Sequence, residues 1–210
     1  MIIADGSNLY ETQLIFEATK GDLDAFNILV LKYQNLIYNH AYVMMGDRYT
    51  AEDITQVSLI KAFKNISGFR GGSFQAWLLK IETNVCYDEM RWAIRHPTIP
   101  LIPEDEDCGE LESPVWLTDP NLSTQVIVER LELSRTLNRM LNELPAIYRN
   151  PMTLIDIHEL DYSEAAVVLD IPIGTVKSRL ARARFKMKEK MQNNFDIPRS
   201  LSSSNLRAVA

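Results

Sequence analysis

Residues 172–184 read PIGTVKSRLARAR, in which turn residues and a hydroxyl lead into an amphipathic helical pattern. The apolar side recurs at spacings of four, three and four, which is typical of a buried helix face: Val176, Leu180, Ala183 and Met187. The opposite side is predicted to face outward: Lys177, Ser178, Arg182 and Phe185. From Lys177 to Lys190 seven basic residues stand against one acid. Because solvated helices usually interleave both signs, this helix indicates a polyanionic ligand, and its size fits the major groove of DNA.

A shorter helix is predicted just before this one. Residues 161–164, DYSE, indicate its start, with Ser163 as N-cap and Glu164 as a first-turn carboxylate. The sequence Asp170-Ile171-Pro172 ends it, because proline lacks an N–H and biases its predecessor away from the helix. Helix, tight turn and basic helix together predict a helix-turn-helix. The alternative is an ordinary helical hairpin with a solvated basic face, and the one-sided charge argues against it.

Composition excludes several function classes for the 210-residue chain. No apolar run approaches the roughly 20 residues of a membrane span, and the N-terminus lacks a basic leader. Two cysteines, Cys86 and Cys108, make no disulfide framework, which indicates a reducing, cytoplasmic compartment; a redox pair between them stays open. The histidines have no metal-like spacing, and no nucleophile motif or glycine-rich phosphate loop stands out. We therefore expect a protein that is not an enzyme and has no cofactor or metal.

The formal net charge of −6 is unevenly distributed along the chain. Residues 1–96 hold 11 acids and nine bases, and residues 97–129 hold eight acids and no base. Residues 130–192 hold eight acids and 11 bases. The acidic character therefore lies mainly in one segment, and the mean charge does not exclude a nucleic-acid ligand.

The pattern before residue 96 is helical throughout, and an all-α protein is predicted. One stretch keeps a three-four apolar spacing over about five turns: Phe26, Leu29, Tyr33, Leu36, Ile37, His40, Ala41 and Met44. Side-chain caps are expected at three helix starts: Asp22, Thr50 and Ser73. The helix after Ser73 is expected to carry one apolar face: Phe74, Trp77, Leu78, Ile81 and Val85.

Two small helical domains are expected on either side of a linker. The first covers residues 10–96, and the second covers residues 124–192 and contains the helix-turn-helix. Residues 97–123 are rich in proline and acid and bury too little apolar surface to offset the entropy of ordering, so a flexible acidic linker is expected. Pro151 is expected to kink a helix or delay its start, and the serine-rich tail 193–210 is expected to be disordered.

Several phrases of the first domain resemble region 2 of bacterial sigma factors. They are GD…AF at residues 21–26, GD…AEDITQV at 46–57, and FRG…F…WL…I…N…D…R at 69–91. Two phrases of the second domain resemble sigma region 4: LP…YR at 144–149 and GTVKSR…RAR at 174–184. In order, spacing and two-domain layout, residues 10–96 and 125–190 resemble an extracytoplasmic-function (ECF) sigma factor. The resemblance implies a protein that binds core RNA polymerase, recognises the −35 element with the second domain and opens the −10 element with the first.

The resemblance further implies that the third helix binds the clamp helices of the polymerase beta-prime subunit. The residues implied are Glu52, Asp53 and Gln56, which form one polar patch at spacings i, i+1 and i+4. The alternative is that the two acids only compensate the helix dipole in a first turn. Gln56 lies beyond that turn and favours docking.

The fourth helix and the loop before it are implied to handle the −10 element. Opening DNA takes bases out of the stack, and aromatic, polar and cationic groups hold the bases and the backbone. The candidates are Phe69, Arg70, Lys80, Asn84, Tyr87, Arg91, Trp92 and Arg95, whereas Trp77, Leu78 and Ile81 are interpreted as core. Glycines in the loop 67–72 allow it to adapt to an extruded base, and the alternative is a plain connection with Phe69 buried.

The helix-turn-helix is implied to bind the −35 element. Lys177, Ser178 and Arg182 share the outward face and are the candidates for base edges. The phosphate candidates are Arg149, Thr175, Arg179 and Arg184. The acidic linker is implied to run through polymerase channels, with a plain solvated tether as the alternative.

Some positions depart from the family pattern. Ser58 stands where a bulky apolar residue is usual, and Glu82 and Thr83 replace commoner small or basic residues, so an altered −10 contact is expected. Two other function classes stay open: a helix-turn-helix regulator that binds duplex DNA alone, and an interaction module that mainly holds a partner. Whether an anti-sigma factor binds the chain also stays open.

Overall fold

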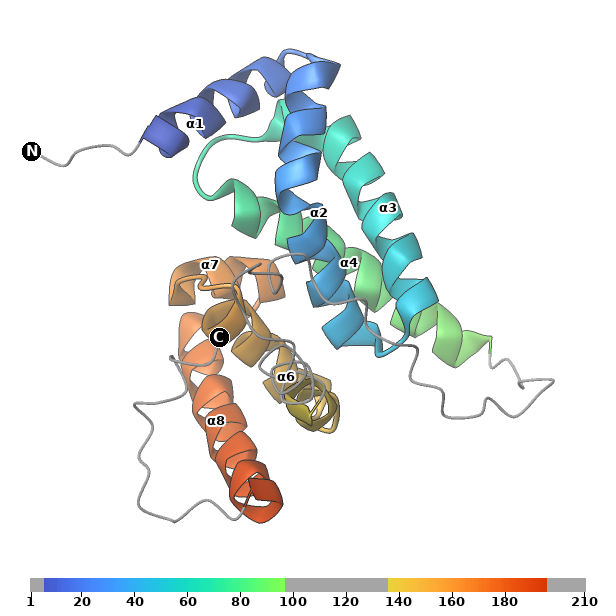
Figure 1. Cartoon of the computed structure of the whole chain (residues 1–210), viewed down its shortest axis with the longest axis vertical. Helices are drawn as coiled ribbons and strands as arrows, with labels where there is room; N and C mark the ends of the chain where they lie inside the picture. The colour runs from blue at the N-terminus through green and yellow to red at the C-terminus, as the bar shows by residue number, and fades with distance from the viewer. Residues whose placement is uncertain (1–5, 97–135, 196–210) are drawn as a thin grey trace, which may run out of the picture.

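The computed structural model describes residues 6–96 and 136–195, and every element in these two ranges is helical (Figure 1). The elements are α1 (Gly6–Thr19), α2 (Leu23–Met45), α3 (Arg48–Asn65), the short 3₁₀ turn η1 (Ile66–Gly68), α4 (Phe74–Arg95), α6 (Ala146–Met152), the π turn η3 (Thr153–Ile157), α7 (Tyr162–Leu169) and α8 (Ile173–Phe195). A further helical stretch spans 136–142. The predicted all-α class is confirmed. The predicted linker, Cys108 and residues 196–210 of the predicted tail lie outside the described residues. The tail was predicted to begin at 193, which was wrong for residues 193–195, because α8 continues to Phe195.

The N-terminal domain is built from α1 to α4. The long helices α2 and α3 lie side by side, α1 packs against α2, and α4 crosses both long helices (Figure 1). The predicted apolar stripe of α2 is confirmed, since all its members are buried except the half-buried Leu36. On α4, Phe74, Leu78 and Val85 are buried, whereas Trp77 and Ile81 are half-buried at the edge of the core.

Two of the three predicted caps in this domain are confirmed. Asp22 accepts from the backbone N–H of Asp24 at 2.9 Å, and Ser73 Oγ accepts from Ala76 N–H at 3.1 Å. The Thr50 cap was wrong: α3 begins at Arg48, and its N-cap Asp47 accepts from Thr50 N–H at 2.7 Å. The helix starts earlier because Gly46 takes a left-handed φ of 77°, which ends α2 and turns the chain at once.

The C-terminal domain is described from residue 136 to residue 195, and α6 decides between the two alternatives predicted for Pro151, a kink or a delayed helix start. Helix α6 begins at Ala146, directly after Pro145, so Pro151 does not delay its start. Pro151 lies inside α6, and the helix widens into the π turn η3 immediately afterwards. Such a local widening is one way in which a helix accommodates the missing proline N–H.

The predicted helix-turn-helix is present as α7, a tight turn and α8. Its N-cap is Asp161 rather than Ser163: Asp161 accepts from Glu164 N–H at 2.7 Å, and the Glu164 side chain accepts from Asp161 N–H at 2.9 Å. This reciprocal capping box places Glu164 at the third helical position, so the helix starts two residues earlier than predicted. Asp170 ends α7 in a left-handed conformation, and α8 starts after Pro172.

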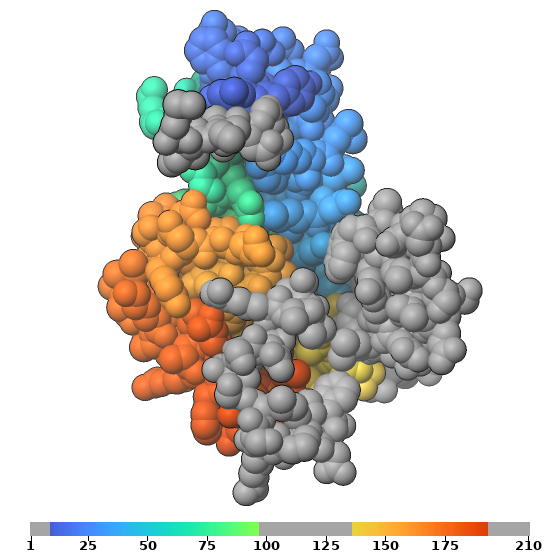
Figure 2. Space-filling model, turned by 60° about the vertical axis from the view of Figure 1, so that its left-hand side comes forward, coloured from blue at the N-terminus to red at the C-terminus, as the bar shows by residue number. Residues whose placement is uncertain are grey.

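The two domains are in direct contact. Helix α7 packs on α4, and α6 approaches α2. One apolar cluster contains buried residues of both domains, among them Leu79 on the N-terminal side and Leu154 and Val168 on the C-terminal side. Figure 2 shows the C-terminal domain, in orange, against the blue and green N-terminal domain.

Candidate nucleic-acid and polymerase interface

Helix α8 has the two faces that the sequence predicts. Its apolar side is buried, with Val176 and Ala183 at 0% exposure, and it packs against α7 and the helix at 136–142. The opposite side is exposed and consists of Lys177, Ser178, Arg182 and Phe185. A basic surface at the start of the second helix is therefore held in place by the core beneath it.

The first turns of α8 are further fixed by local contacts. Ser178 Oγ donates to the Thr175 carbonyl at 3.0 Å, which leaves the hydroxyl oxygen able to accept from a ligand. The Lys177 Nζ lies 5.5 Å from the centre of the Tyr162 ring on α7, within the range of a cation–π contact. These side chains are exposed but restrained, as base-reading groups need to be.

The phosphate candidates differ in availability. Thr175 and Arg179 are half-buried at the edges of the basic face. Arg184 forms a two-pronged pair with Asp156 of η3, with Nε–Oδ2 at 3.0 Å and Nη2–Oδ1 at 2.5 Å, and this hydrogen bond raises the pKa of Arg184. Arg184 therefore ties α8 to η3, and its guanidinium is less available to a phosphate than an unpaired one.

Arg149 is turned inward. Its Nη1 donates to the Asn142 carbonyl and to Asn142 Oδ1 at 3.3 and 3.1 Å, and its Nη2 donates to the Met44 carbonyl of α2 at 3.3 Å. Burial lowers the pKa of this guanidinium. In this arrangement Arg149 joins the two domains rather than facing a ligand.

The exposed side of α4 carries most of the −10 candidates. Asn84, Arg91, Trp92 and Arg95 are exposed, Lys80 and Tyr87 are half-buried, and Arg91 pairs with Asp88 at 2.8 Å. Trp92 stacks on His96 with ring centres 4.9 Å apart. A shallow hollow lined by Asp88, Arg91, Ile94 and Arg95 lies near the end of the helix. From residue 77 to residue 91 this face extends about 20 Å, enough for several nucleotides of a single strand.

The loop before α4 presents one aromatic and one cation. Phe69 is half-buried, and its ring meets the rings of Phe74 and Trp77 edge-on at 5.5 Å in each case. Arg70 is exposed beside it, and Gly71 and Gly72 take left-handed φ angles of 95° and 90°. The full burial of Phe69 that a plain connection would require is not observed.

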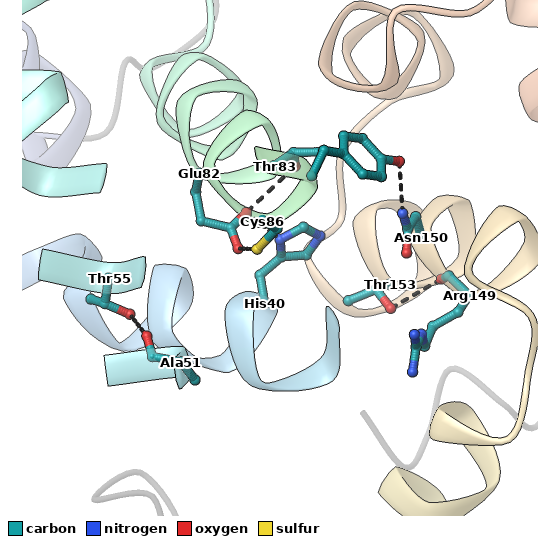
Figure 3. A network of polar contacts seen from close by, with 10 residues as sticks. His40, Ala51, Thr55, Glu82, Thr83, Cys86, Arg149, Asn150 and Thr153 are labelled. Atoms are coloured by element: carbon teal, nitrogen blue, oxygen red, sulfur yellow. Dashed lines mark hydrogen bonds and ion pairs between the residues drawn. The ribbon is translucent and has the colours of Figure 1, made fainter. Parts of the chain in front are cut away.

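The residues that depart from the family pattern point inward. Glu82 and Thr83 have 0% exposure, and the Glu82 side chain points from α4 toward His40 (Figure 3). The Glu82 carboxylate meets His40 Nδ1 at 2.5 Å and accepts from Cys86 Sγ at 3.0 Å. Ser58 is buried too, and its Oγ has no hydrogen-bond partner among the described residues. These three side chains therefore belong to the packing of α3 and α4 and do not reach the exposed side of α4.

Helix α3 presents the predicted polar patch and two residues that the sequence reasoning missed. Because α3 starts at Arg48, neither Glu52 nor Asp53 lies in its first turn, and dipole compensation no longer accounts for them. Glu52 accepts from Arg48 Nε at 2.9 Å, while Asp53 and Gln56 are exposed. Val57 and Ile60 are exposed at 41% and 55% beside them. Their spacing of four and seven residues from Asp53 could have identified them.

Two kinds of feature do not occur in the described ranges 6–96 and 136–195. No group of three histidine, cysteine or acidic side chains there is placed to hold a metal ion. No helix there combines the length and the apolar character that crossing a membrane requires. Cys86 is buried, and burial together with the Glu82 carboxylate raises the pKa of its thiol, so it is not a reactive thiolate.

Comparison with known proteins agrees with this architecture. Residues 29–95 match the family Sigma-70 region 2, and residues 134–187 match Sigma-70, region 4. The chain is 34% identical over 180 residues to the ECF RNA polymerase sigma factor SigW of Bacillus subtilis, covering 85% of this chain and 95% of that protein. It is 32% identical over 183 residues to the RNA polymerase sigma-H factor of Pseudomonas aeruginosa, covering 87% and 94%.

A solved structure has a similar fold. It is the sigma factor RpoE of Bartonella quintana in complex with the anti-sigma factor NepR, with 25% identity, a TM-score of 0.63, and coverage of 82% of this chain and 99% of that one. Both domains, the helix-turn-helix and nearly the full length of the relatives are thus shared. The chain belongs to the ECF RNA polymerase sigma factors, which direct core RNA polymerase to promoters.

Proposed function

We propose that this chain divides promoter recognition between its two domains. Residues 10–96 bind core polymerase and the −10 element, residues 124–192 bind the −35 element, and residues 97–123 connect them through the polymerase. The observation that carries the proposal is the exposed basic face of α8, fixed from below by a buried apolar face and a capped α7. This is the geometry with which a helix-turn-helix reads a major groove.

At the −35 element, base edges are contacted by Lys177, Ser178 and Arg182. Cationic and hydroxyl groups at the start of a recognition helix can donate to guanine O6 and N7 or bond either way to other bases. Arg179 and Thr175 at the rim contact phosphates, joined by Arg149 and Arg184 when their present partners release them.

At the −10 element, Phe69 supplies a stacking surface and Asn84 a donor and acceptor for an extruded base. Four cations contact the backbone of the displaced strand: Arg70, Lys80, Arg91 and Arg95. Trp92 lies beside them. The half-exposed aromatic group of Phe69 and Trp77 supports this assignment, because a base can stack only on a ring that reaches the surface.

Core polymerase docks on the exposed face of α3, which the beta-prime clamp helices recognise. Asp53 and Gln56 supply the polar contacts, and Glu52 stays paired with Arg48 or exchanges partner. Val57 and Ile60 supply apolar area at the centre of this face, which is where interface energy usually concentrates. We also propose a cytoplasmic location and an anti-sigma factor as a partner, since the similar Bartonella quintana sigma factor was solved with one.

Run-off transcription tests the proposal. The full chain added to core polymerase should give transcripts from a cognate promoter and none from a promoter with a scrambled −35 element. The chain alone should bind the same duplex weakly. A tight duplex complex without polymerase and no transcription with it would identify a helix-turn-helix regulator. If the chain binds neither core enzyme nor DNA, the remaining alternative is an interaction module that mainly holds a protein partner.

A further inference from the structure

The interface between the two domains has a polar seam as well as an apolar cluster. Gln75 Nε2 of α4 donates to the His158 carbonyl at 2.8 Å. Asn150 Nδ2 donates to Tyr87 Oη at 2.9 Å, the dashed line from Asn150 in Figure 3. Arg149 Nη2 reaches the Met44 carbonyl at 3.3 Å. These three hydrogen bonds, two at the consecutive residues Arg149 and Asn150 and one at His158, hold the second domain on α2 and α4.

This closed arrangement uses Arg149, which is a phosphate candidate of the −35 surface. The guanidinium cannot donate to Met44 and Asn142 and face DNA at the same time, because its Nε is also buried. Closure and full −35 binding therefore compete for the same side chain. This step rests on the proposed function of Arg149.

His158 lies within the same interface. Its ring meets the His40 ring of α2 with centres 5.4 Å apart, and its buried Nε2 has no hydrogen-bond partner among the described residues. The ionisable groups of this interface are His40 on α2, Glu82, Cys86 and Tyr87 on α4, and Arg149 on α6. In the segment of His158 itself, Asp156 is paired with Arg184 of α8, and Glu159 is exposed. Glu82, the acid on the facing helix, is already bonded to His40 and Cys86. A proton on Nε2 of His158 would therefore find no hydrogen-bond acceptor among the described residues and would lie beside a second imidazole.

We propose that the closed interface is a latch that keeps Arg149 away from DNA. Protonation of His158 at acidic pH opens this latch. Burial, and after it the neighbouring His40, lowers the pKa of His158 to about 3 in the closed form. In an open form the ring returns to the ordinary histidine pKa of about 6.5. Closure is then favoured above pH 6.5 and is weakened as the pH falls below it. Between pH 7.5 and 5.5 the ratio of closed to open chains should fall about tenfold.

Energy transfer within the full chain measures this ratio. Donor and acceptor dyes go on Lys64→Cys at the end of α3 and on Lys188→Cys in α8, both exposed, with Cys108→Ser, while Cys86 is buried. From pH 7.5 to 5.5 the transfer should change as the ratio of closed to open chains falls about tenfold. His158→Gln, which cannot take up the proton, should reduce that change to less than twofold. The matched control His96→Gln, at the exposed end of α4, should behave like the wild-type chain. No change in the wild type, or an unaltered change in His158→Gln, overturns the latch.

Histidine titration by NMR gives a second, independent measurement. It settles the question in the case that the substitution His158→Gln by itself opens the chain at both pH values. The three histidines are assigned by substitution, and His158 should titrate below pH 5 in the wild-type chain. In Asn150→Ala, which loses the bond to Tyr87, His158 should move toward 6.5. Titration near 6.5 in a wild-type chain that is closed at pH 7.5 overturns the proposal. Both readouts contain neither polymerase nor DNA, so a failed run-off assay would refute the proposed function and leave the latch result standing.

Discussion

Both carboxylate oxygens of Glu82 are used inside the protein, by His40 Nδ1 at 2.5 Å and by Cys86 Sγ at 3.0 Å. The group sits at 0% exposure, where an unsatisfied charge or hydrogen-bonding atom is costly. The network holds α4 on α2 from the side opposite Asn84. The surface of α4 that we propose for the −10 element thus depends on a residue that cannot touch DNA in this arrangement.

Replacing Glu82 with alanine should lower the free energy of unfolding by about 3–5 kcal/mol, because it strands His40 and leaves a cavity. Glu82→Gln keeps two hydrogen-bonding atoms, so its free energy of unfolding should fall by less. Chemical denaturation checks this, with Asp88→Ala on the exposed side of α4 as the control, expected within about 0.5 kcal/mol. Equal losses in Glu82→Ala and Asp88→Ala would show that the buried network contributes nothing special.

Arg182 and Arg179 should fail in different ways. Arg182→Ala should cost about 1–3 kcal/mol in promoter binding and relax discrimination at one −35 base pair, because an exposed guanidinium on this face can bond a base edge. Arg179→Ala should weaken binding to all sequences and lower the salt slope by about one unit. Holoenzyme binding to promoters varied at each −35 position separates the two, with Lys188→Ala as the control. A uniform loss for Arg182→Ala would make it a phosphate ligand.

At the scale of the element, α3 combines polar and apolar side chains on one exposed face. Asp53→Ala with Gln56→Ala should weaken core-polymerase binding by about 1–2 kcal/mol, because both side chains project from that face. Val57→Ala with Ile60→Ala should weaken it further through lost apolar contact. Competition for core enzyme measures the affinity, and circular dichroism confirms the fold. The pair Lys61→Ala and Lys64→Ala controls for unrelated changes in α3; normal competition by the first double variant would refute the docking assignment.

The capping box of α7 predicts a pH effect. Hydrogen bonds from the Ser163 hydroxyl and then from the Glu164 N–H lower the pKa of Asp161. Its carboxylate therefore stabilises the fold above the ordinary aspartate pKa of about 3.9, and this contribution is lost as the pH falls through the lowered value. Asp161→Asn keeps a cap without the charge. Thermal unfolding should give the wild type a higher melting temperature than Asp161→Asn at pH 5 and the same melting temperature at pH 2.5. A difference in melting temperature that does not change with pH would contradict the role of the charge.

The elements also show how far the sequence could be interpreted. Periodic burial in α8 and α2 was predictable because each turn repeats the same signal. The helix starts at Asp47 and Asp161 were missed because several consecutive polar residues can cap, and tertiary context selects one. The contacts of Arg149 with Met44 and of Gln75 with His158 join residues far apart in the sequence, so no local sequence pattern predicts them.

At the scale of the whole molecule, the two domains share a core although each matches a separate family region. Leu154 of the C-terminal domain is fully buried in the cluster that also contains Leu79 and Ala76 of α4. Met187 of α8 is buried in a different cluster, which contains residues of the C-terminal domain alone. The two side chains lie in one domain, yet only the first is part of the shared core.

This difference allows the shared core to be tested. Leu154→Ala and Met187→Ala should each cost about 2–5 kcal/mol, because both remove a buried side chain of similar size. Only Leu154→Ala should also reduce the hydrogen-exchange protection of α4, since the stability of α4 includes its packing on the second domain. Met187→Ala should reduce the hydrogen-exchange protection of α6 and α8 and leave the protection of α4 as it is in the wild type. If α4 keeps its full protection in Leu154→Ala at pH 7.5, the domains are energetically independent, and closure cannot restrain Arg149.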